Sequence, residues 1–160
     1  DDVLAQFGIT SLTESQKRNL NRVWHRLEPW PDAVEGLSRL KQRFMICTLS
    51  NGNLGLLANM AKRVGLAWDC LLSAEVFRQY KPHPDTYLGV AQVFDVPAEA
   101  VMMVAAHQDD LDSARSYGLK TAYIERPNEF GAANPKDIAG SPANDRHAGS
   151  IIALAEQLGC

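Results

Sequence analysis

Short apolar runs of strand length alternate with segments of helical periodicity along this chain, and this alternation constrains the fold more than any other feature. Strands are predicted at 44–49, 70–74, 101–105 and 120–124. Helices are predicted at 13–27, from Pro31 through Leu40, and at 53–64, 84–94, 109–117 and 150–158. Residues 128–149 are rich in Pro, Gly, Asn and Ala and are predicted to form an irregular loop. Alternation of this kind is typical of a parallel sheet with helices on both faces, so we predict an α/β fold.

The first 28 residues differ from the rest of the chain. The segment Thr13-Glu14-Ser15-Gln16 has the form of a capping box, which favours a helix start, and apolar residues follow it at helical spacing. Pro29 and Pro31 then interrupt the helical pattern. We therefore predict a small helical segment over 1–28 and an α/β core over 29–160.

Composition and charge bear on partners and compartment. A net charge of −3 gives no reason to expect a nucleic acid or an anionic membrane surface as a partner. No apolar run approaches the roughly 18 residues that a membrane-spanning helix needs. Cys47 and Cys70 lie in apolar runs and Cys160 is terminal, so we predict reduced, buried thiols rather than a disulfide or a metal site. A cytoplasmic location is the expectation that follows.

Three polar clusters come directly after apolar, strand-like runs. They are Leu49-Ser50-Asn51-Gly52-Asn53, Tyr80-Lys81-Pro82-His83-Pro84-Asp85-Thr86-Tyr87 and Ala105-Ala106-His107-Gln108-Asp109-Asp110. Because the carboxyl ends of parallel strands face one crevice, residues at these positions converge even when they are far apart in sequence. The sequence therefore predicts one pocket that contains a hydroxyl, an amide, a lysine and a carboxylate.

The order and spacing of these clusters resemble the haloacid dehalogenase (HAD) superfamily, and the residues around them resemble its type II 2-haloacid dehalogenase branch. The resemblance runs from about Leu27 to Gly131 and so covers well over half of the chain. It implies a HAD-like Rossmannoid core, with residues 1–28 as part of a helical cap. It also implies hydrolysis of a small 2-haloacid without a cofactor, and a homodimer, which is common in the family.

The resemblance assigns a role to five residues of the clusters. Ser50 is expected to bind the substrate carboxylate, and Asn51 is expected to help bind the departing halide. Lys81 is expected to keep a nucleophilic aspartate ionised, since an opposite charge nearby lowers a carboxylate pKa. Tyr87 is expected near the substrate, and Asp110 is expected to pair with Lys81 and to activate the hydrolytic water. The implied reaction is formation of an aspartyl ester followed by its hydrolysis.

Four of these residues also have a purely structural interpretation. Ser50, Asn51 and Gly52 are residue types found in ordinary strand-to-helix turns. A lone surface lysine such as Lys81 is usually a solvated charge, and Tyr87 also suits a half-buried position on a helix. These interpretations lose weight because the three clusters occur together and in the family's order.

The third cluster separates two activities within the superfamily. Magnesium-dependent phosphatases carry Gly-Asp at the strand end and another Asp four positions later, and these carboxylates hold the metal. The matching positions here are Ala105-Ala106 and Asp110. Because the first metal carboxylate is replaced, we predict a metal-independent dehalogenase and keep a magnesium-dependent phosphatase as the alternative.

His107 departs from the usual dehalogenase pattern. Many type II dehalogenases have Ser-x-Asn where this chain has Ala105-x-His107. The hydrogen bonds of that serine and asparagine are therefore either absent or made by His107. A histidine at this position is also suited to orienting water, since it titrates close to neutral pH. The plainer alternative is a polar residue that forms hydrogen bonds at a helix start.

One expected part is not found before Ser50. The family's nucleophilic aspartate ends an apolar run in an Asp-x-x-Gly-Thr motif, and Asp1, Asp2 and Asp32 lack that context. In the superfamily, the strand with this aspartate lies between the strands that lead to Ser50 and Asp110. We therefore expect the chain to be an N-terminally truncated fragment that is inactive alone. The remaining alternative is a non-catalytic binding module.

Overall fold

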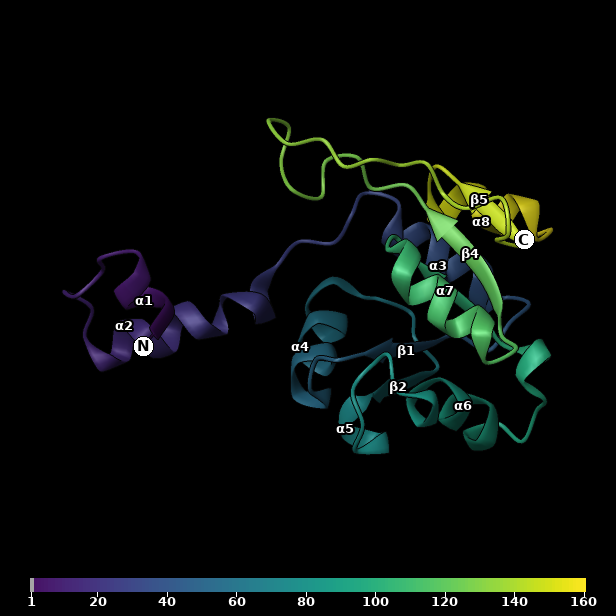
Figure 1. Cartoon of the computed structure of the whole chain (residues 1–160), viewed down its shortest axis with the longest axis horizontal. Helices are drawn as coiled ribbons and strands as arrows, with labels where there is room; N and C mark the ends of the chain where they lie inside the picture. Colours follow the sequence, from purple (N-terminus) through teal and green to yellow (C-terminus); the bar gives the residue numbers. More distant parts are fainter. Residues whose placement is uncertain (1) are drawn as a thin grey trace.

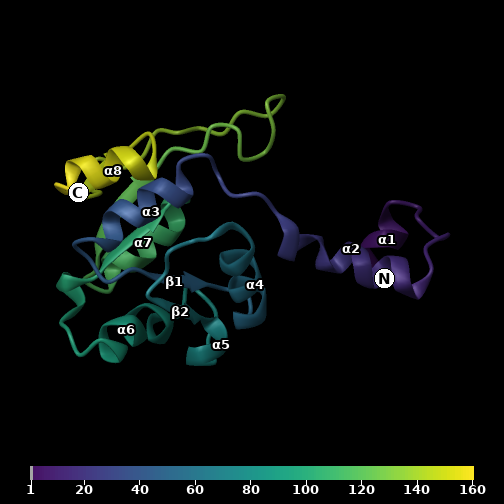
Figure 2. The ribbon, with the colours of Figure 1, turned by 180° about the vertical axis from the view of Figure 1, so that it is seen from behind.

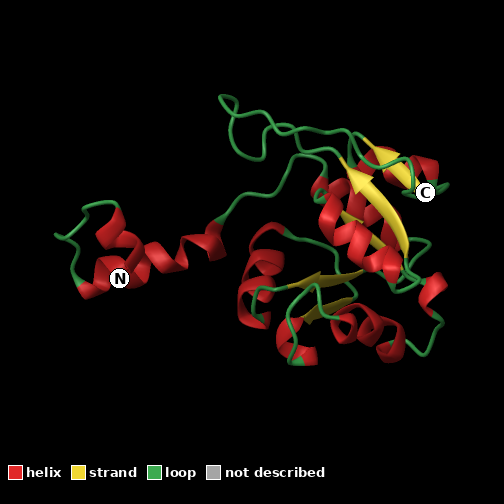
Figure 3. Ribbon diagram, in the orientation of Figure 1, coloured by secondary structure: helices red, strands yellow, loops and turns green. Residues whose placement is uncertain are grey.

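The structure, a computed structural model that describes residues 2–160, has the α/β fold predicted from the alternation of strands and helices (Figure 3). The α-helices are α1 Asp2–Gln6, α2 Glu14–Asn21, α3 Ala33–Lys41, α4 Leu54–Val64, α5 Ala74–Phe77, α6 Pro84–Val93, α7 Gln108–Ser116 and α8 Ile151–Gln157. The 3-10 helices are η1 Arg22–Arg26 and η2 Ala98–Ala100. The strands are β1 Cys47–Ser50, β2 Cys70–Ser73, β3 Met102–Ala105, β4 Lys120–Ile124 and β5 Arg146–Ala148. Asp1 lies outside the described residues.

The strands of the described residues pair in parallel and form two sheets, β1–β2 and β3–β4–β5. The sheets adjoin, because Leu49 of β1 packs against a hydrophobic cluster that includes Met103 of β3. β1 and β3 nevertheless do not pair with each other, and within residues 2–160 each has one edge without a strand partner. The carboxyl ends of β1 and β3 lead directly into two of the polar clusters.

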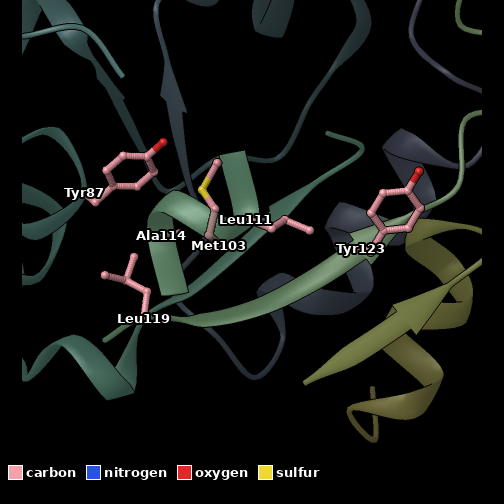
Figure 4. Close-up of a cluster of buried hydrophobic side chains, with 6 residues drawn as sticks. All are labelled: Tyr87, Met103, Leu111, Ala114, Leu119 and Tyr123. Atoms are coloured by element: carbon pink, nitrogen blue, oxygen red, sulfur yellow. The ribbon is translucent and has the colours of Figure 1, made fainter. Parts of the chain in front are cut away.

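Helix α7 packs against β3 and β4 and forms the centre of one hydrophobic cluster (Figure 4). Leu111 and Ala114 share one face of the helix, since side chains three positions apart are neighbours. Both are fully buried and pack with Met103 and Tyr123. This packing places the first turn of α7, which carries Asp110, at the carboxyl end of β3.

Local capping explains the bounds of α4, which follows the first polar cluster. Asn53 Oδ1 accepts the N–H of Leu56 at 2.7 Å and so starts the helix. Gly65 ends it in the left-handed conformation, with φ at 74°, where a side chain would be strained. The helix predicted over 53–64 is therefore confirmed, and the turn between β1 and α4 is short.

The segment formed by α1, α2 and η1 stands away from the α/β core (Figures 1 and 2). No residue from 2 to 28 is buried, and large apolar side chains such as Phe7 are exposed. Contact with the core includes Arg63 of α4, which donates to the backbone carbonyls of Arg26 and Leu27. The assignment of residues 1–28 as a separate cap segment stays a prediction.

Three predicted segments differ in the structure. The strand predicted over 44–49 begins only at Cys47 and ends at Ser50. The helix predicted over 13–27 has its capping box, but it is α-helical only to Asn21 and continues as η1. Such tightening is common at a helix C-terminus, and here Arg63 binds a carbonyl of η1. The loop predicted over 128–149 contains β5, which has only one buried residue and so lacks an apolar pattern. The short helices α1 and α5 were also not predicted.

The cysteines are free thiols, as predicted, but they are partly exposed rather than buried. Cys47 and Cys70 are register partners on β1 and β2. Burial, with the charges of Cys70 and Asp69, raises the pKa of Cys47 to about 11. Cys47 is therefore a neutral thiol at neutral pH.

Candidate active site

A lysine, a carboxylate and a tyrosine from separate segments meet at the carboxyl end of β3. Lys81 Nζ lies 2.5 Å from Asp110 Oδ2, and the Tyr87 hydroxyl donates to Asp110 Oδ1 at 2.6 Å. The side chains of Lys81 and Asp110 are 15% and 16% exposed, and Tyr87 is fully buried. The predicted pairing of Lys81 with Asp110 is thus present, and both oxygens of the carboxylate are engaged by donors.

Tyr87 acts as a hydrogen-bond donor in this network. Burial raises the pKa of Tyr87, and its hydrogen bond to the Asp110 carboxylate raises that pKa further. The hydroxyl is therefore protonated at neutral pH. The ring of Tyr117 lies 5.6 Å from that of Tyr87, and its hydroxyl donates to the Pro82 carbonyl at 3.1 Å. These contacts hold the segment after Lys81 against the end of α7.

Asn51 holds the backbone of Lys81. Asn51 Oδ1 accepts the Lys81 N–H at 2.8 Å, and Asn51 Nδ2 donates to the Lys81 carbonyl at 3.2 Å. The Lys81–Pro82 peptide bond is cis. The reciprocal hydrogen bonds join the turn after β1 to the segment that carries Lys81. The second hydrogen on Nδ2 has no partner within residues 2–160, so the expected contact with a halide stays a prediction.

Ser50 ends β1 and faces the same turn. Its Oγ accepts the N–H of Gly52 at 3.0 Å, which is an ordinary serine turn. Among the described residues no hydrogen bond joins Ser50 to Lys81 or Asp110. Its hydroxyl hydrogen is free to donate, so the expected role in binding a carboxylate also stays a prediction.

His107 belongs to a second network at the same strand end. Its Nε2 lies 2.7 Å from Glu129 Oε1, and Glu129 Oε2 accepts from Lys136 Nζ at 2.6 Å. Lys136 also donates to the Ala106 carbonyl at 2.5 Å. Sequence reasoning missed Glu129 and Lys136, because both lie in the segment 128–149 and no local pattern indicates that this segment returns to β3.

The described residues offer no obvious metal centre. Within residues 2–160, no group of three or more His, Cys, Asp or Glu side chains is arranged to hold a metal ion. At Ala106, where magnesium-dependent phosphatases carry a carboxylate, the backbone carbonyl binds the ammonium of Lys136. Over the same described range, no helix is both long and apolar enough to cross a membrane.

Comparison with known proteins gives a consistent family. A family model for haloacid dehalogenase-like hydrolases matches residues 1–118. The chain is 31% identical over 161 residues to (S)-2-haloacid dehalogenase 1 of Pseudomonas sp. (strain CBS-3), and the matched region covers 99% of the chain and 67% of that relative. It is 31% identical over 115 residues to the (S)-2-haloacid dehalogenase of Xanthobacter autotrophicus, and the matched region covers 71% of the chain and 45% of that relative. The chain thus spans about half to two thirds of the length of these relatives.

Solved structures agree in fold. An L-2-haloacid dehalogenase superposes with a TM-score of 0.93 at 41% identity, over 98% of this chain and 69% of that one. A defluorinating L-2-haloacid dehalogenase superposes with a TM-score of 0.94 at 42% identity, over 100% of this chain and 66% of that one. The predicted fold is therefore confirmed.

Proposed function

The chain belongs to the haloacid dehalogenase-like hydrolases, and on that premise we propose that it forms most of the active site of an enzyme that hydrolyses 2-haloalkanoic acids to 2-hydroxyalkanoic acids. The observation that carries this proposal is the largely buried Lys81–Asp110 pair, which the Tyr87 hydroxyl braces at the carboxyl end of β3. A lysine that serves only as a solvated surface charge would not be expected to form a largely buried ion pair of this kind. The names of relatives at 31% and 41% identity support the substrate class.

In the first step, an aspartate carboxylate attacks the α-carbon of the 2-haloacid, and the halide leaves with the bonding electron pair. The ammonium of Lys81 keeps the attacking carboxylate ionised, because a nearby positive charge favours the charged form. The free hydroxyl hydrogen of Ser50 binds the substrate carboxylate. The free amide hydrogen of Asn51 contributes to the halide site.

In the second step, water attacks the carbonyl carbon of the aspartyl ester. The 2-hydroxyalkanoate leaves, and the aspartate is restored. Asp110 holds Lys81 and positions the water, and Tyr87 holds Asp110 by donating to its second oxygen. His107, at the same strand end, is a further candidate for orienting the water.

The nucleophilic aspartate is proposed to lie on a strand between β1 and β3, outside these 160 residues. β1 and β3 each have one edge without a strand partner in the described residues, which supports a strand at this position. Buried backbone groups left unpaired cost about 1–3 kcal/mol each, so an inserted strand would be stabilising. Its carboxyl end would lie between Ser50 and Asp110. The homodimer also stays a prediction.

The enzyme is proposed to work without a metal. A halide leaves as a weakly basic monoanion and needs only a few hydrogen-bond donors, whereas phosphoryl transfer concentrates charge on oxygens that a metal must offset. Ala106 in place of a metal carboxylate supports this proposal. The ammonium of Lys136 on the Ala106 carbonyl supports it further, because it would repel a divalent cation.

The test is release of chloride from 2-chloropropionate. We expect the product of the complete coding sequence to release chloride, and the isolated 160 residues to release none above a buffer control. In the protein made from the complete coding sequence, Lys81→Ala should abolish most of the activity. Lys62→Ala, at an exposed position of α4, should leave the activity unchanged. Chloride release by the isolated chain would show that another residue attacks. A folded full product that releases no chloride would refute the dehalogenase proposal.

A further inference from the structure

The segment after β4 folds back onto the carboxyl end of β3 and brings two charged side chains to it. Lys136 Nζ donates to the Ala106 carbonyl at 2.5 Å and to Glu129 Oε2 at 2.6 Å. The other oxygen of Glu129 lies 2.7 Å from His107 Nε2. The side chains of Lys136 and Glu129 are 14% and 25% exposed, so this pair is better shielded than an ordinary surface ion pair.

Glu129 is a carboxylate at neutral pH. Burial opposes its ionisation, but the hydrogen bonds from Lys136 and His107 and the charge of Lys136 hold the pKa of Glu129 below its usual range. The ring of Phe130, with its centroid 5.9 Å from Lys136 Nζ, adds a cation–π contact that keeps the ammonium in place. Lys136 therefore fixes Glu129, and Glu129 fixes the ring of His107.

This arrangement decides which nitrogen of His107 carries a proton. A carboxylate only accepts, so Nε2 must donate, and the neutral ring then has an unshared electron pair on Nδ1. Within residues 2–160 no hydrogen bond engages Nδ1, although His107 occupies the N-cap position of α7. His83, at the N-cap of α6, differs because its Nδ1 accepts the N–H of Asp85. His107 therefore has a free acceptor nitrogen.

Asp110 is less free to take a proton. Its two oxygens already accept from Lys81 and Tyr87. His107 precedes Asp110 by three residues and lies at the start of the same helix. Among the described residues, no donor engages Nδ1 of His107 in this way. His107 is thus the better acceptor, and Asp110 is the better anchor.

We propose that Glu129 and Lys136 are positioning residues that hold His107 as the base of the ester-hydrolysis step, an inference that rests on the proposed dehalogenase function. The water oxygen bonds to the ester carbonyl carbon, and one water proton passes to His107 Nδ1. When the bond between that carbon and the product oxygen breaks, the oxygen takes this proton back. The products are the 2-hydroxyalkanoate and an aspartic acid, whose proton is lost to solvent.

The site of the proton is measured by ¹⁵N NMR of the imidazole nitrogens in the protein made from the complete coding sequence, and this readout does not depend on activity. We expect the Nε2–H form of neutral His107 to predominate, and Glu129→Ala to give a mixture of both tautomers. Glu125→Ala is the matched control, because Glu125 binds another histidine, His147, at 2.8 Å, and it should leave the His107 signals unchanged. A predominant Nδ1–H form in the unmodified chain would overturn the proposal.

Single-turnover kinetics of the full coding-sequence product test the role itself. His107→Ala is expected to slow ester hydrolysis by about 100-fold while ester formation changes little. Glu129→Ala is expected to slow it by about 10-fold or more, because the ring then samples the wrong tautomer. Glu125→Ala should leave both steps unchanged. Where Glu129→Ala does not fold, Glu129→Gln keeps the side-chain size and should slow hydrolysis to a smaller degree.

The outcomes separate the two proposals. Ester hydrolysis at the unmodified rate in folded His107→Ala would overturn the role of His107 while leaving the dehalogenase function intact. If the folded protein made from the complete coding sequence releases no halide, the dehalogenase function is refuted, and with it the catalytic role of His107. The tautomer measurement would still decide whether Glu129 holds the ring.

Discussion

A largely buried ion pair between Arg126 and Asp32, which are far apart in the sequence, gives a direct test of how packing stabilises the core. Arg126, just after β4, donates to Asp32 Oδ2 at 2.9 Å, and the same oxygen accepts the N–H of Ile151 at 2.6 Å. The guanidinium also lies 5.0 Å from the ring centroid of Trp30. One carboxylate thus ties the starts of α3 and α8 to the end of β4. We predict that Asp32→Ala destabilises the chain strongly.

The magnitude follows from burial. The side chains of Arg126 and Asp32 are 10% and 14% exposed, so Asp32→Ala leaves a nearly dry guanidinium and the Ile151 N–H without their partner. Removing one partner of a buried ion pair costs about 3–5 kcal/mol. Arg126 keeps its hydrogen bond to the Glu125 carbonyl and its contact with Trp30, so we expect the low end, about 3 kcal/mol.

Urea unfolding of the protein made from the complete coding sequence, followed by circular dichroism, measures this loss. Glu35→Ala is the control, because its partner Arg39 is one helical turn away and the Glu35 side chain is 57% exposed. Exposed pairs of this kind contribute less than about 1 kcal/mol. An Asp32→Ala variant within about 1 kcal/mol of the unmodified chain would refute the argument that burial makes this pair structurally important.

Three further predictions concern pH, mechanism and metal. Burial disfavours the charge of Asp32, but hydrogen bonds from Ile151 and Arg126 hold the pKa of Asp32 below its usual value. The stability that the Asp32 carboxylate gives to the folded state is therefore present above about pH 4, and it is lost as the pH falls through the pKa of the folded state. Urea unfolding at a series of pH values should show that the destabilisation by Asp32→Ala becomes smaller below about pH 4. In the full product, mass spectrometry after rapid mixing with substrate should show an accumulated acyl adduct in Asp110→Asn and none in Lys81→Ala; equal absence in both, with folding intact, would leave Asp110 as mainly a support for Lys81. Chloride release should survive exhaustive chelation, and loss of turnover that magnesium restores would favour the phosphatase alternative.

Elements set by local signals were predictable from the sequence. The strand predicted at 120–124 is β4, and the helix predicted at 84–94 is α6 to within one residue, because an apolar run and a proline at the first helical position are local features. The 3-10 helix η1 was predicted as part of an α-helix, and strand β5 was predicted as part of a loop. Both were missed because their hydrogen bonds are made to residues far away in the sequence. Arg63 binds the carbonyls at the end of η1, and β4 supplies the hydrogen bonds of β5.

The candidate site was predictable in part for the same reason. Because parallel strands end at one edge of a sheet, the sequence indicated that Lys81 and Asp110 would meet, and they do. It did not indicate that Tyr87 would take the second oxygen of Asp110, or that Asn51 would hold the backbone of Lys81. Those contacts depend on side-chain directions that strand order alone does not specify.

Periodicity, turn residues and polar clusters at strand ends were sufficient for the fold class and for the residue types around the site. The folded chain was needed to show that Glu129 and Lys136 join His107, and that Asp32 meets Arg126 across 94 residues. The physical reason is that apolar patterns act through neighbours along the chain, whereas an ion pair between distant segments forms only once the packed core has set the path of the loops that carry it.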